Sequence, residues 1–152
     1  KIKKIKEVMP DAFIGVDVIV GTRGETEEYF EDAYRFIAGL DVTQLHVFSY
    51  SERPGTQALK IDHVVAPEEK HKRSQRLLAL SDEKTQAFYV RHIGQTMPVL
   101  MEKTKAGMPM HGFTANYIRV EVENDPSLDN KMVDVLLGEL NEDGTALKGT
   151  IL

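Results

Sequence analysis

The sequence lacks cysteine altogether across its 152 residues. Disulfides, thiolate zinc sites and cysteine-ligated iron–sulfur clusters are therefore excluded within the chain, and a reducing, cytoplasmic compartment is the expectation. The five histidines also lack metal-ligand spacing, so we expect no metal site from these residues. They are His46, His63, His71, His92 and His111.

Long apolar runs and an excess of positive charge are missing as well. No run approaches the roughly 18 apolar residues that span a bilayer, and the opening KIKKIKEVM lacks the apolar stretch of a secretory signal. We therefore expect no membrane partner. The chain has 19 Lys and Arg against 24 Asp and Glu, a net charge of -5, which argues against bulk electrostatic binding to nucleic acid but leaves room for a local basic stripe. Because the sequence opens at Lys1 within a helical pattern, we expect a fragment.

Residues 1–93 alternate helical and strand patterns. Pro10 ends a first helix, and strands are predicted over 14–20 and 44–50. Between the strands Thr26 is expected to cap a helix. The apolar face of that helix is formed by Phe30, Ala33, Ile37 and Leu40. This order implies parallel strands with right-handed crossovers, as in an α/β sheet or a segment of a (β/α) barrel.

A long helix is predicted over 67–93, because Pro67 followed by two glutamates is typical of a helix start. Ser81 begins a second start signal, so a break there is an open alternative. The residues expected to pack inward are Leu77, Leu80, Ala87 and Phe88. A basic cluster on the first half, for which a solvated face and an RNA contact are the two interpretations, consists of Lys70, Lys72, Arg73 and Arg76.

Residues 94–152 contain five short, mostly alternating runs and no convincing helix. Asp143-Gly144 offers a hairpin turn. Five strands in under about 60 residues suit a small closed β-barrel of the oligonucleotide-binding type, because closure removes exposed strand edges. The chain is thus expected to have an α/β part followed by an all-β barrel.

Two turns follow the two predicted parallel strands, GTRGE at 21–25 and SYSERPGT at 49–56. In α/β folds reactive groups gather at the carboxyl ends of the strands. Gly21 and Gly24 allow close approach of a ligand or of another backbone segment. The pattern matches neither GxGxxG nor GxxxxGK[ST], which makes a standard nucleotide fold less favoured. In the second turn the aromatic rings suit stacking, and Arg53 suits a carboxylate or phosphate.

Four ordered segments together resemble the carboxyl-terminal part of the radical S-adenosylmethionine methylthiotransferases. They read DVIVGTRGETEEYFED, LHVFSYSERPGTQA, RSQRLLALSDEK and GFTANYIRVEV. The resemblance implies that 1–93 is the end of the radical enzyme barrel, with a linker helix over 67–93, and that 94–152 is an RNA-binding β-barrel called TRAM. One departure is that Thr22 and Arg23 stand where the family usually has an aromatic residue and a proline.

The resemblance also implies an activity. Within the family, LHVFSYS followed by RPGT is most similar to the enzymes that add a methylthio group to C2 of N6-threonylcarbamoyladenosine beside the anticodon of tRNA. Such enzymes use S-adenosylmethionine and two 4Fe-4S clusters, which upstream residues would hold. The expected partner is the anticodon stem-loop of tRNA. No catalytic residue is expected here, so this piece alone is expected to be inactive.

The resemblance assigns expected roles to individual residues of the two parts. The cofactor side would be formed by Ile19, Gly21, Glu25, Val47, Phe48 and Tyr50. The loop facing substrate or cofactor would contain Arg53, Gly55 and Thr56. The RNA-binding residues of the β-barrel would be Phe113, Asn116, Tyr117 and Arg119, although packing of both aromatic rings in the core is the alternative interpretation.

Two other functions remain open from the sequence. One is a stand-alone RNA-binding or adaptor protein in which the α/β part is only a scaffold. The other is a small α/β nucleotide-binding domain, which would require phosphate affinity at the GTRGE turn.

Overall fold

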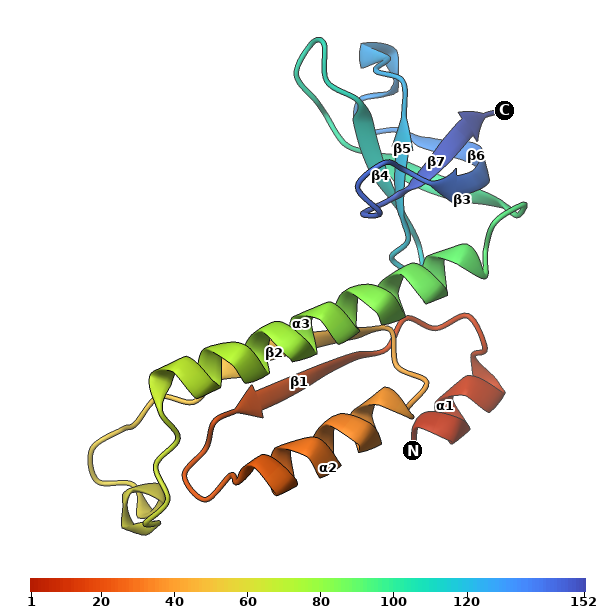
Figure 1. Cartoon of the computed structure of the whole chain (residues 1–152). Helices are drawn as coiled ribbons and strands as arrows, with labels where there is room; N and C mark the ends of the chain where they lie inside the picture. The colour runs from red at the N-terminus through yellow and green to blue at the C-terminus, as the bar shows by residue number, and fades with distance from the viewer. The chain divides into compact units, whose positions relative to one another are not determined.

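The computed structural model describes residues 1–152, and the chain divides into two compact units (Figure 1). Unit 1 comprises Lys1–Pro10 and Ile14–Lys84, and unit 2 comprises Asp11–Phe13 and Thr85–Leu152. The long helix α3 (Pro67–Val90) contributes residues to both units. No helix of the chain combines the length and apolarity that crossing a membrane requires.

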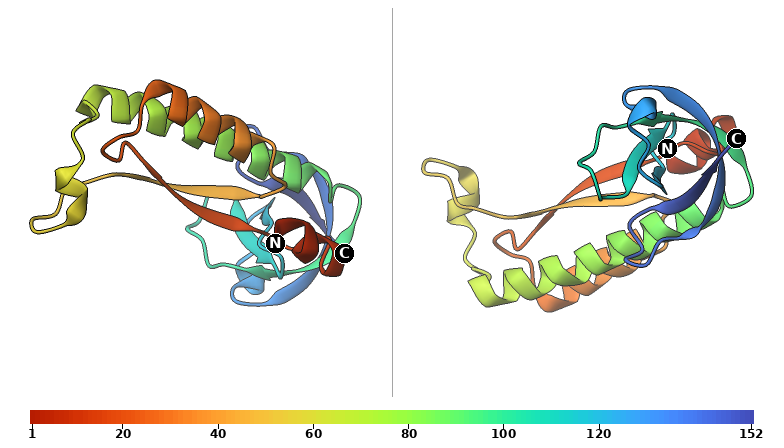
Figure 2. Two further views of the ribbon diagram at one scale, coloured as in Figure 1. Left: turned by 90° about the horizontal axis from the view of Figure 1, so that it is seen from below. Right: turned by 90° about the horizontal axis from the view of Figure 1, so that it is seen from above.

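Unit 1 is built on two parallel strands, β1 (Gly15–Val20) and β2 (Gln44–Ser49), paired residue by residue along their whole length. Helix α1 (Ile2–Val8) precedes β1, and α2 (Glu27–Ala38) connects the strands. A 3-10 turn, η1 (Gln57–Lys60), follows β2. Helices α2 and α3 lie along the same face of the sheet (Figure 2). The predicted α/β alternation with parallel pairing is confirmed.

The core of unit 1 joins that sheet face to the two helices. Its buried residues are Val20, Phe30, Val42, Leu45, Leu77 and Leu80. The predicted apolar face of α2 is confirmed at Phe30, Ile37 and Leu40, which pack in or against this core. Ala33 lies on the same helix face, beside Phe30 and Ile37, but remains exposed.

The ends of α2 are fixed by polar groups. The hydroxyl of Thr26 accepts a hydrogen bond from the N–H of Tyr29 at 3.2 Å, so the predicted cap is confirmed. At the other end the ammonium of Lys84, on α3, donates to the carbonyls of Ala38 (3.1 Å) and Leu40 (2.7 Å). A cation on the last carbonyls of a helix satisfies groups that the helix itself leaves unpaired.

Helix α3 runs unbroken through Ser81, so the alternative of a second helix start there is wrong. The Ser81 hydroxyl is buried and bonds to the N–H and the carbonyl of Leu45, at 2.9 and 3.3 Å. Leu77, Leu80 and Phe88 are buried as predicted, whereas Ala87 is exposed. The reason is that the helix serves two cores: after Lys84 its buried residues are Phe88 and Tyr89, which belong to the core of unit 2.

Unit 2 contains a closed five-stranded barrel with the strand order β3-β4-β5-β7-β6. The strands are β3 (Thr96–Met101), β4 (Met110–Thr114), β5 (Arg119–Val122), β6 (Met132–Leu140) and β7 (Leu147–Ile151). All pairs are antiparallel except β5 with β7, and a 3-10 turn, η2 (Pro126–Leu128), precedes β6. The predicted closed barrel is therefore confirmed.

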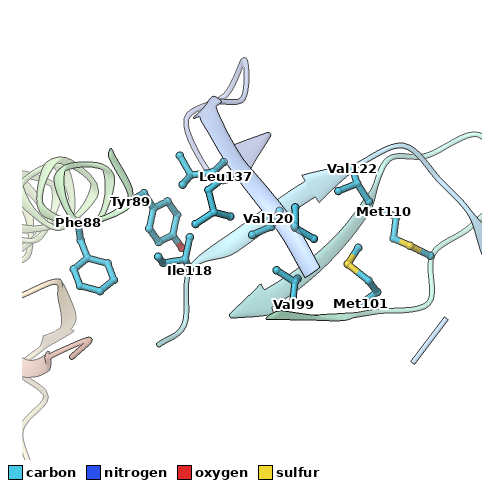
Figure 3. Packing of buried hydrophobic residues seen from close by; sticks show 11 residues of the cluster. Phe88, Tyr89, Val99, Met101, Met110, Ile118, Val120, Val122 and Leu137 are labelled. Atoms are coloured by element: carbon cyan, nitrogen blue, oxygen red, sulfur yellow. The ribbon is translucent and has the colours of Figure 1, made fainter. Parts of the chain in front are cut away.

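The barrel interior is filled by apolar side chains that point toward one another (Figure 3). The buried members on the strands and their turns are Val99, Met101, Met110, Ile118, Val120, Val122, Val135, Leu137 and Leu147. Gly149 lets the strands approach this closely, because a Cβ atom there would lie 2.5 Å from Cγ1 of Val135. Gly144, at φ +72°, forms the predicted hairpin turn between β6 and β7.

Candidate functional site

A cavity of about 390 Å³ lies at the carboxyl ends of β1 and β2 in unit 1. Ile19 comes from β1, Phe48 and Ser49 come from β2, and the remaining lining residues follow β2 directly. Those are Tyr50, Ser51, Arg53, Thr56 and Ala58. Parallel strands end at one edge of their sheet, so both predicted turns begin at this edge.

The cavity wall is apolar although it faces solvent. Ile19 and Phe48 are paired neighbours across the strands, and they are 58% and 55% exposed. On the opposite sheet face Val20 and Leu45 are buried. The fold therefore leaves two large apolar side chains uncovered at the strand ends.

Two polar groups of the cavity have no partner within the chain. The hydroxyl oxygen of Tyr50 is buried and makes no hydrogen bond. Native proteins rarely leave such a group unsatisfied, so a partner such as a bound water or a ligand atom is expected beside it. Arg53 is an exposed residue of the loop that lines the cavity, and its guanidinium forms no ion pair. The cavity thus combines an apolar wall, an unsatisfied hydroxyl and an unpaired cation.

The GTRGE turn beside the cavity is held by hydrogen bonds within the turn and to later segments. The N–H of Gly21 donates to the carboxylate of Glu25 at 2.9 Å, and the N–H of Gly24 donates to the carbonyl of His63 at 2.7 Å. A Cβ atom on Gly21, at φ +79°, would lie 2.4 Å from Cγ of Lys70. The amides of both glycines are therefore already used within unit 1, which argues against a phosphate cradle built on them.

Arg73 from α3 holds the same turn from the other side. Its side chain is 5% exposed, and it forms ion pairs with Glu25 (2.9 Å), Glu27 (3.2 Å) and Glu69 (3.2 Å). It also donates to the backbone carbonyl of Glu25 at 3.0 Å. Because Glu25 binds Gly21 and Arg73 together, its carboxylate is committed to the structure of the turn.

The basic cluster predicted on α3 is mostly engaged within unit 1. Besides Arg73, Arg76 pairs with Glu31 and lies over the ring of Tyr34 at 4.7 Å. Lys70 donates to the carbonyl of Tyr50 at 3.1 Å. These contacts support the structural interpretation of the cluster over an RNA contact.

The structure brings together part of the residues expected at the cofactor side. Ile19, Phe48 and Tyr50 line the cavity. Gly21 and Glu25 form the adjoining turn, and Val47 packs against the core.

In the loop that follows β2, Arg53 and Thr56 line the cavity, and Gly55 makes the turn between them at φ +79°. Ser49, Ser51 and Ala58 also line it and were not predicted. The two serines flank Tyr50 in the sequence, and this adjacency was the available signal.

In unit 2 three of the four predicted RNA-binding residues lie together. The ring centroids of Phe113 and Tyr117 are 5.2 Å apart, and Phe113 pairs with Arg119 across β4 and β5. Tyr117 is 63% exposed and adopts φ 68°, a left-handed conformation that is uncommon for aromatic residues. The side chain of Asn116 is bound internally, to the hydroxyl of Thr114 (2.7 Å) and the carbonyl of Asp11 (3.0 Å).

Titratable side chains elsewhere in unit 2 form internal networks. Glu121 accepts hydrogen bonds from Asn141 and His111, both at 2.9 Å, and these bonds, with that from Asn141 foremost, hold the pKa of Glu121 below its ordinary value. His92 is buried and bonds to the carbonyl of Phe88 at 2.8 Å. No group of three or more His, Asp or Glu side chains is arranged to hold a metal ion.

Sequence comparison with known proteins identifies the family to which the chain belongs. A threonylcarbamoyladenosine tRNA methylthiotransferase of Bacillus subtilis is 33% identical over 139 residues, covering 89% of this chain and 31% of that protein. A tRNA-2-methylthio-N(6)-dimethylallyladenosine synthase of Protochlamydia amoebophila is 39% identical over 107 residues (68% of this chain, 23% of that protein). A synthase of the same name from Aliarcobacter butzleri is 32% identical over 152 residues (98% of this chain, 34% of that protein).

The chain spans about a third or less of the length of these curated relatives. No protein-family model matches it. By similarity over most of its length, the chain belongs to the tRNA methylthiotransferase family.

Proposed function

We propose that this chain is the carboxyl-terminal part of a tRNA methylthiotransferase, in which unit 1 provides one wall of an S-adenosylmethionine site and unit 2 binds tRNA. The observation that carries the proposal is the cavity at the ends of β1 and β2, with its exposed apolar wall and its unsatisfied Tyr50 hydroxyl. The family supports the class of reaction, and the cavity supports our proposal for the part of the site that this chain would contribute.

The cavity residues fit an adenosyl group. The exposed faces of Ile19 and Phe48 offer an apolar and aromatic surface for the flat adenine ring. The buried hydroxyl of Tyr50 would gain a partner among the polar atoms of the base or ribose. Arg53, unpaired in the loop, suits the carboxylate of the methionine part or a phosphate of the substrate. Gly21 and Glu25 would not contact the ligand but would hold the conformation of the turn beside it.

The open sheet of unit 1 supports its assignment to a larger (β/α) barrel. Parallel sheets are usually covered on both faces, and a sheet of two strands is marginal alone. Here β1 and β2 pair only with each other, and the face that carries Ile19 and Phe48 is exposed. In the proposed enzyme upstream residues would extend this sheet and hold two 4Fe-4S clusters. Reductive cleavage of S-adenosylmethionine would supply the radical that removes hydrogen from C2 of the modified adenosine.

The barrel of unit 2 is proposed to be a TRAM domain that contacts the anticodon stem-loop. Small closed barrels commonly bind single-stranded RNA by stacking of bases on aromatic rings beside basic side chains. The neighbouring side chains of Phe113, Tyr117 and Arg119 offer that combination, and Tyr117 is the most exposed of the three. Asn116 would act indirectly by holding the turn that presents Tyr117.

The RNA assignment is tested on the chain itself by fluorescence anisotropy with a labelled anticodon stem-loop. Tyr117→Asn removes the ring while keeping a residue that tolerates φ above zero, so we expect weaker binding by about five- to tenfold without unfolding. Arg119→Ala is expected to weaken binding to a similar extent and to reduce its salt dependence. Lys131→Ala, an exposed lysine of the same unit, is the control. Equal losses in all three variants would contradict a specific surface.

The substrate assignment is N6-threonylcarbamoyladenosine, supported by the similarity of the second turn to enzymes of that class. The relatives include proteins named for that nucleoside and proteins named for dimethylallyladenosine. Full-length protein carrying this chain, reconstituted with iron and sulfide, would be assayed for methylthio transfer to tRNA bearing each modification. Turnover only on dimethylallyladenosine would contradict the assignment. The stand-alone adaptor alternative is not favoured, because these relatives are named as modifying enzymes.

A further inference from the structure

Arg23, in the middle of the GTRGE turn, binds the loop that follows β2 at two separated points. Its guanidinium contacts the carboxylate of Glu52 through Nε and Nη2, each at 2.6 Å. Its Nη1 donates to the carbonyls of Leu59 (2.9 Å) and Ile61 (3.2 Å). The Arg23 side chain is only 19% exposed. A planar guanidinium with several donors is suited to such a bridge, because it can bind a carboxylate and backbone oxygens simultaneously.

The bridged loop contains three of the eight residues that line the cavity. Arg53, Thr56 and Ala58 all lie between Glu52 and Leu59, the two ends held by Arg23. The loop is otherwise weakly fixed. Its internal bonds are short-range. The Thr56 hydroxyl and N–H donate to the carbonyl of Arg53 (2.9 and 3.4 Å), and the N–H groups of Leu59 and Ile61 donate to the carbonyls of Thr56 (3.4 Å) and Ala58 (3.1 Å). Residues Ser51 to Gln57 are all exposed.

The charges around this bridge favour it at neutral pH. The hydrogen bond from Arg23 holds the pKa of Glu52 below its ordinary value, and the same bond raises the pKa of Arg23. Glu52 also faces Lys70, and Arg23 also faces Tyr50 and Asp62. A further link between turn and loop is the bond from Gly24 N–H to the carbonyl of His63. Arg23 is thus the main side chain that joins them.

We propose that Arg23 is a positioning residue that orders residues 52–61 against the turn and thereby sets the affinity of the cavity for its ligand. The inference rests on the proposed function for the identity of that ligand, an adenosyl compound. A loop that is already ordered loses less conformational entropy when the ligand binds, so its preorganisation appears directly in affinity. Arg23 itself touches no lining atom assigned to the ligand, which separates its role from that of Arg53.

The first experiment measures loop order in the whole chain without any ligand. Hydrogen exchange of amides 52–63 and tryptic cleavage after Lys60 are compared between wild type, Arg23→Ala and the control Arg35→Ala. Arg35 is an exposed arginine that pairs only with Asp32 on its own helix. We expect both rates to rise about tenfold in Arg23→Ala alone, because locally opened segments exchange and are cut first. Unchanged rates, or an equal increase across the barrel strands, would overturn the proposal.

The second experiment measures affinity, with S-adenosylhomocysteine as the probe in isothermal titration. We expect Arg23→Ala to weaken binding by about three- to tenfold through loop ordering. Arg23→Lys keeps the charge opposite Glu52 and is expected to restore part of the affinity, which a merely structural loss would not show. A mobile loop with unchanged affinity would refute the positioning role. Absence of binding by wild type would instead contradict the proposed cofactor site, while the exchange rates still decide whether Arg23 orders the loop.

Discussion

The two units of this chain differ in how completely their strands are paired and their apolar side chains are buried. In unit 2 each of the five strands pairs on both sides, and the interior residues Val99, Val120 and Val135 are fully buried. In unit 1 two strands carry helices on one face and leave Ile19 and Phe48 more than half exposed on the other. The barrel buries its interior apolar side chains, whereas the sheet leaves Ile19 and Phe48 exposed at the cavity. The contrast separates residues that hold the fold from residues available to a ligand.

The units also differ in how they use charge. Unit 1 fixes its GTRGE turn with a buried arginine, Arg73, that pairs with Glu25 and Glu27 from a distant segment and with Glu69 on its own helix. In unit 2 the buried polar groups of the β6–β7 hairpin are joined largely through neutral donors, such as the amide of Asn141. A buried charge is costly when its partner is removed. We therefore expect charge substitutions to damage unit 1 more than unit 2.

The largest effect is expected from truncating the barrel core. Leu137 is 1% exposed inside the barrel, and Leu137→Ala should lower the free energy of unfolding by about 2–5 kcal/mol through lost burial and the resulting cavity. The matched control is Leu136→Ala, since Leu136 on the same strand is 38% exposed. Urea titration followed by the amide signals of the barrel measures both. Similar losses would contradict the inward and outward alternation of β6.

The next effect concerns the buried arginine of unit 1. Arg73→Ala leaves the carboxylate of Glu25, with its 15% exposed side chain, without its main cation, and should destabilise unit 1 by about 3 kcal/mol. Hydrogen exchange should accelerate in residues 21–27 while the barrel strands stay protected. Lys72→Ala, one residue earlier and exposed, is the control. If the two variants behaved alike, the network around Arg73 would contribute nothing.

Local signals in the sequence were enough to predict much of this fold. Thr26 precedes two glutamates and was expected to cap a helix, and Asp143-Gly144 was expected to turn a hairpin; both are confirmed. The location of Ile19 and Phe48 at one site was predicted from the family resemblance and from the rule that parallel strands end at the same edge of a sheet. Each of these features depends on residues close in sequence or on a general rule of topology.

Contacts between distant segments could not be predicted in this way. The basic cluster on α3 gave no sign that Arg73 would be buried, because its partners Glu25 and Glu27 lie 48 and 46 residues away. Asn116 was expected at RNA, yet its amide binds the carbonyl of Asp11, 105 residues earlier. Only the folded chain reveals which polar groups are already paired and which, like the Tyr50 hydroxyl, are not.

A smaller effect is expected from pH in the barrel. The pKa of Glu121 is lowered by its bonds from Asn141 and His111, so ionised Glu121 stabilises the native state above its ordinary pKa of about 4.3 and loses that contribution as pH falls through the lowered value. Glu121→Gln should be less stable than wild type by about 1 kcal/mol at most at pH 6.5, because the side chain is partly exposed. Urea unfolding at pH 6.5 and at successively lower pH tests this, and a gap that does not narrow as the pH falls would contradict it.

The smallest effect on stability is expected where the chain leaves its apolar side chains open. Ile19→Ala should change the free energy of unfolding by no more than about 0.5 kcal/mol, because the side chain is already 58% exposed, whereas Val20→Ala, at 1% exposure, should cost clearly more. The order should reverse for S-adenosylhomocysteine, whose affinity should fall about tenfold in Ile19→Ala through loss of the cavity wall. Equal destabilisation by the two variants would mean that Ile19 contributes to the free energy of unfolding as much as Val20 does. The exposed face of the sheet would then be as important for folding as its buried face, and the proposed difference between the open sheet and the closed barrel would be wrong.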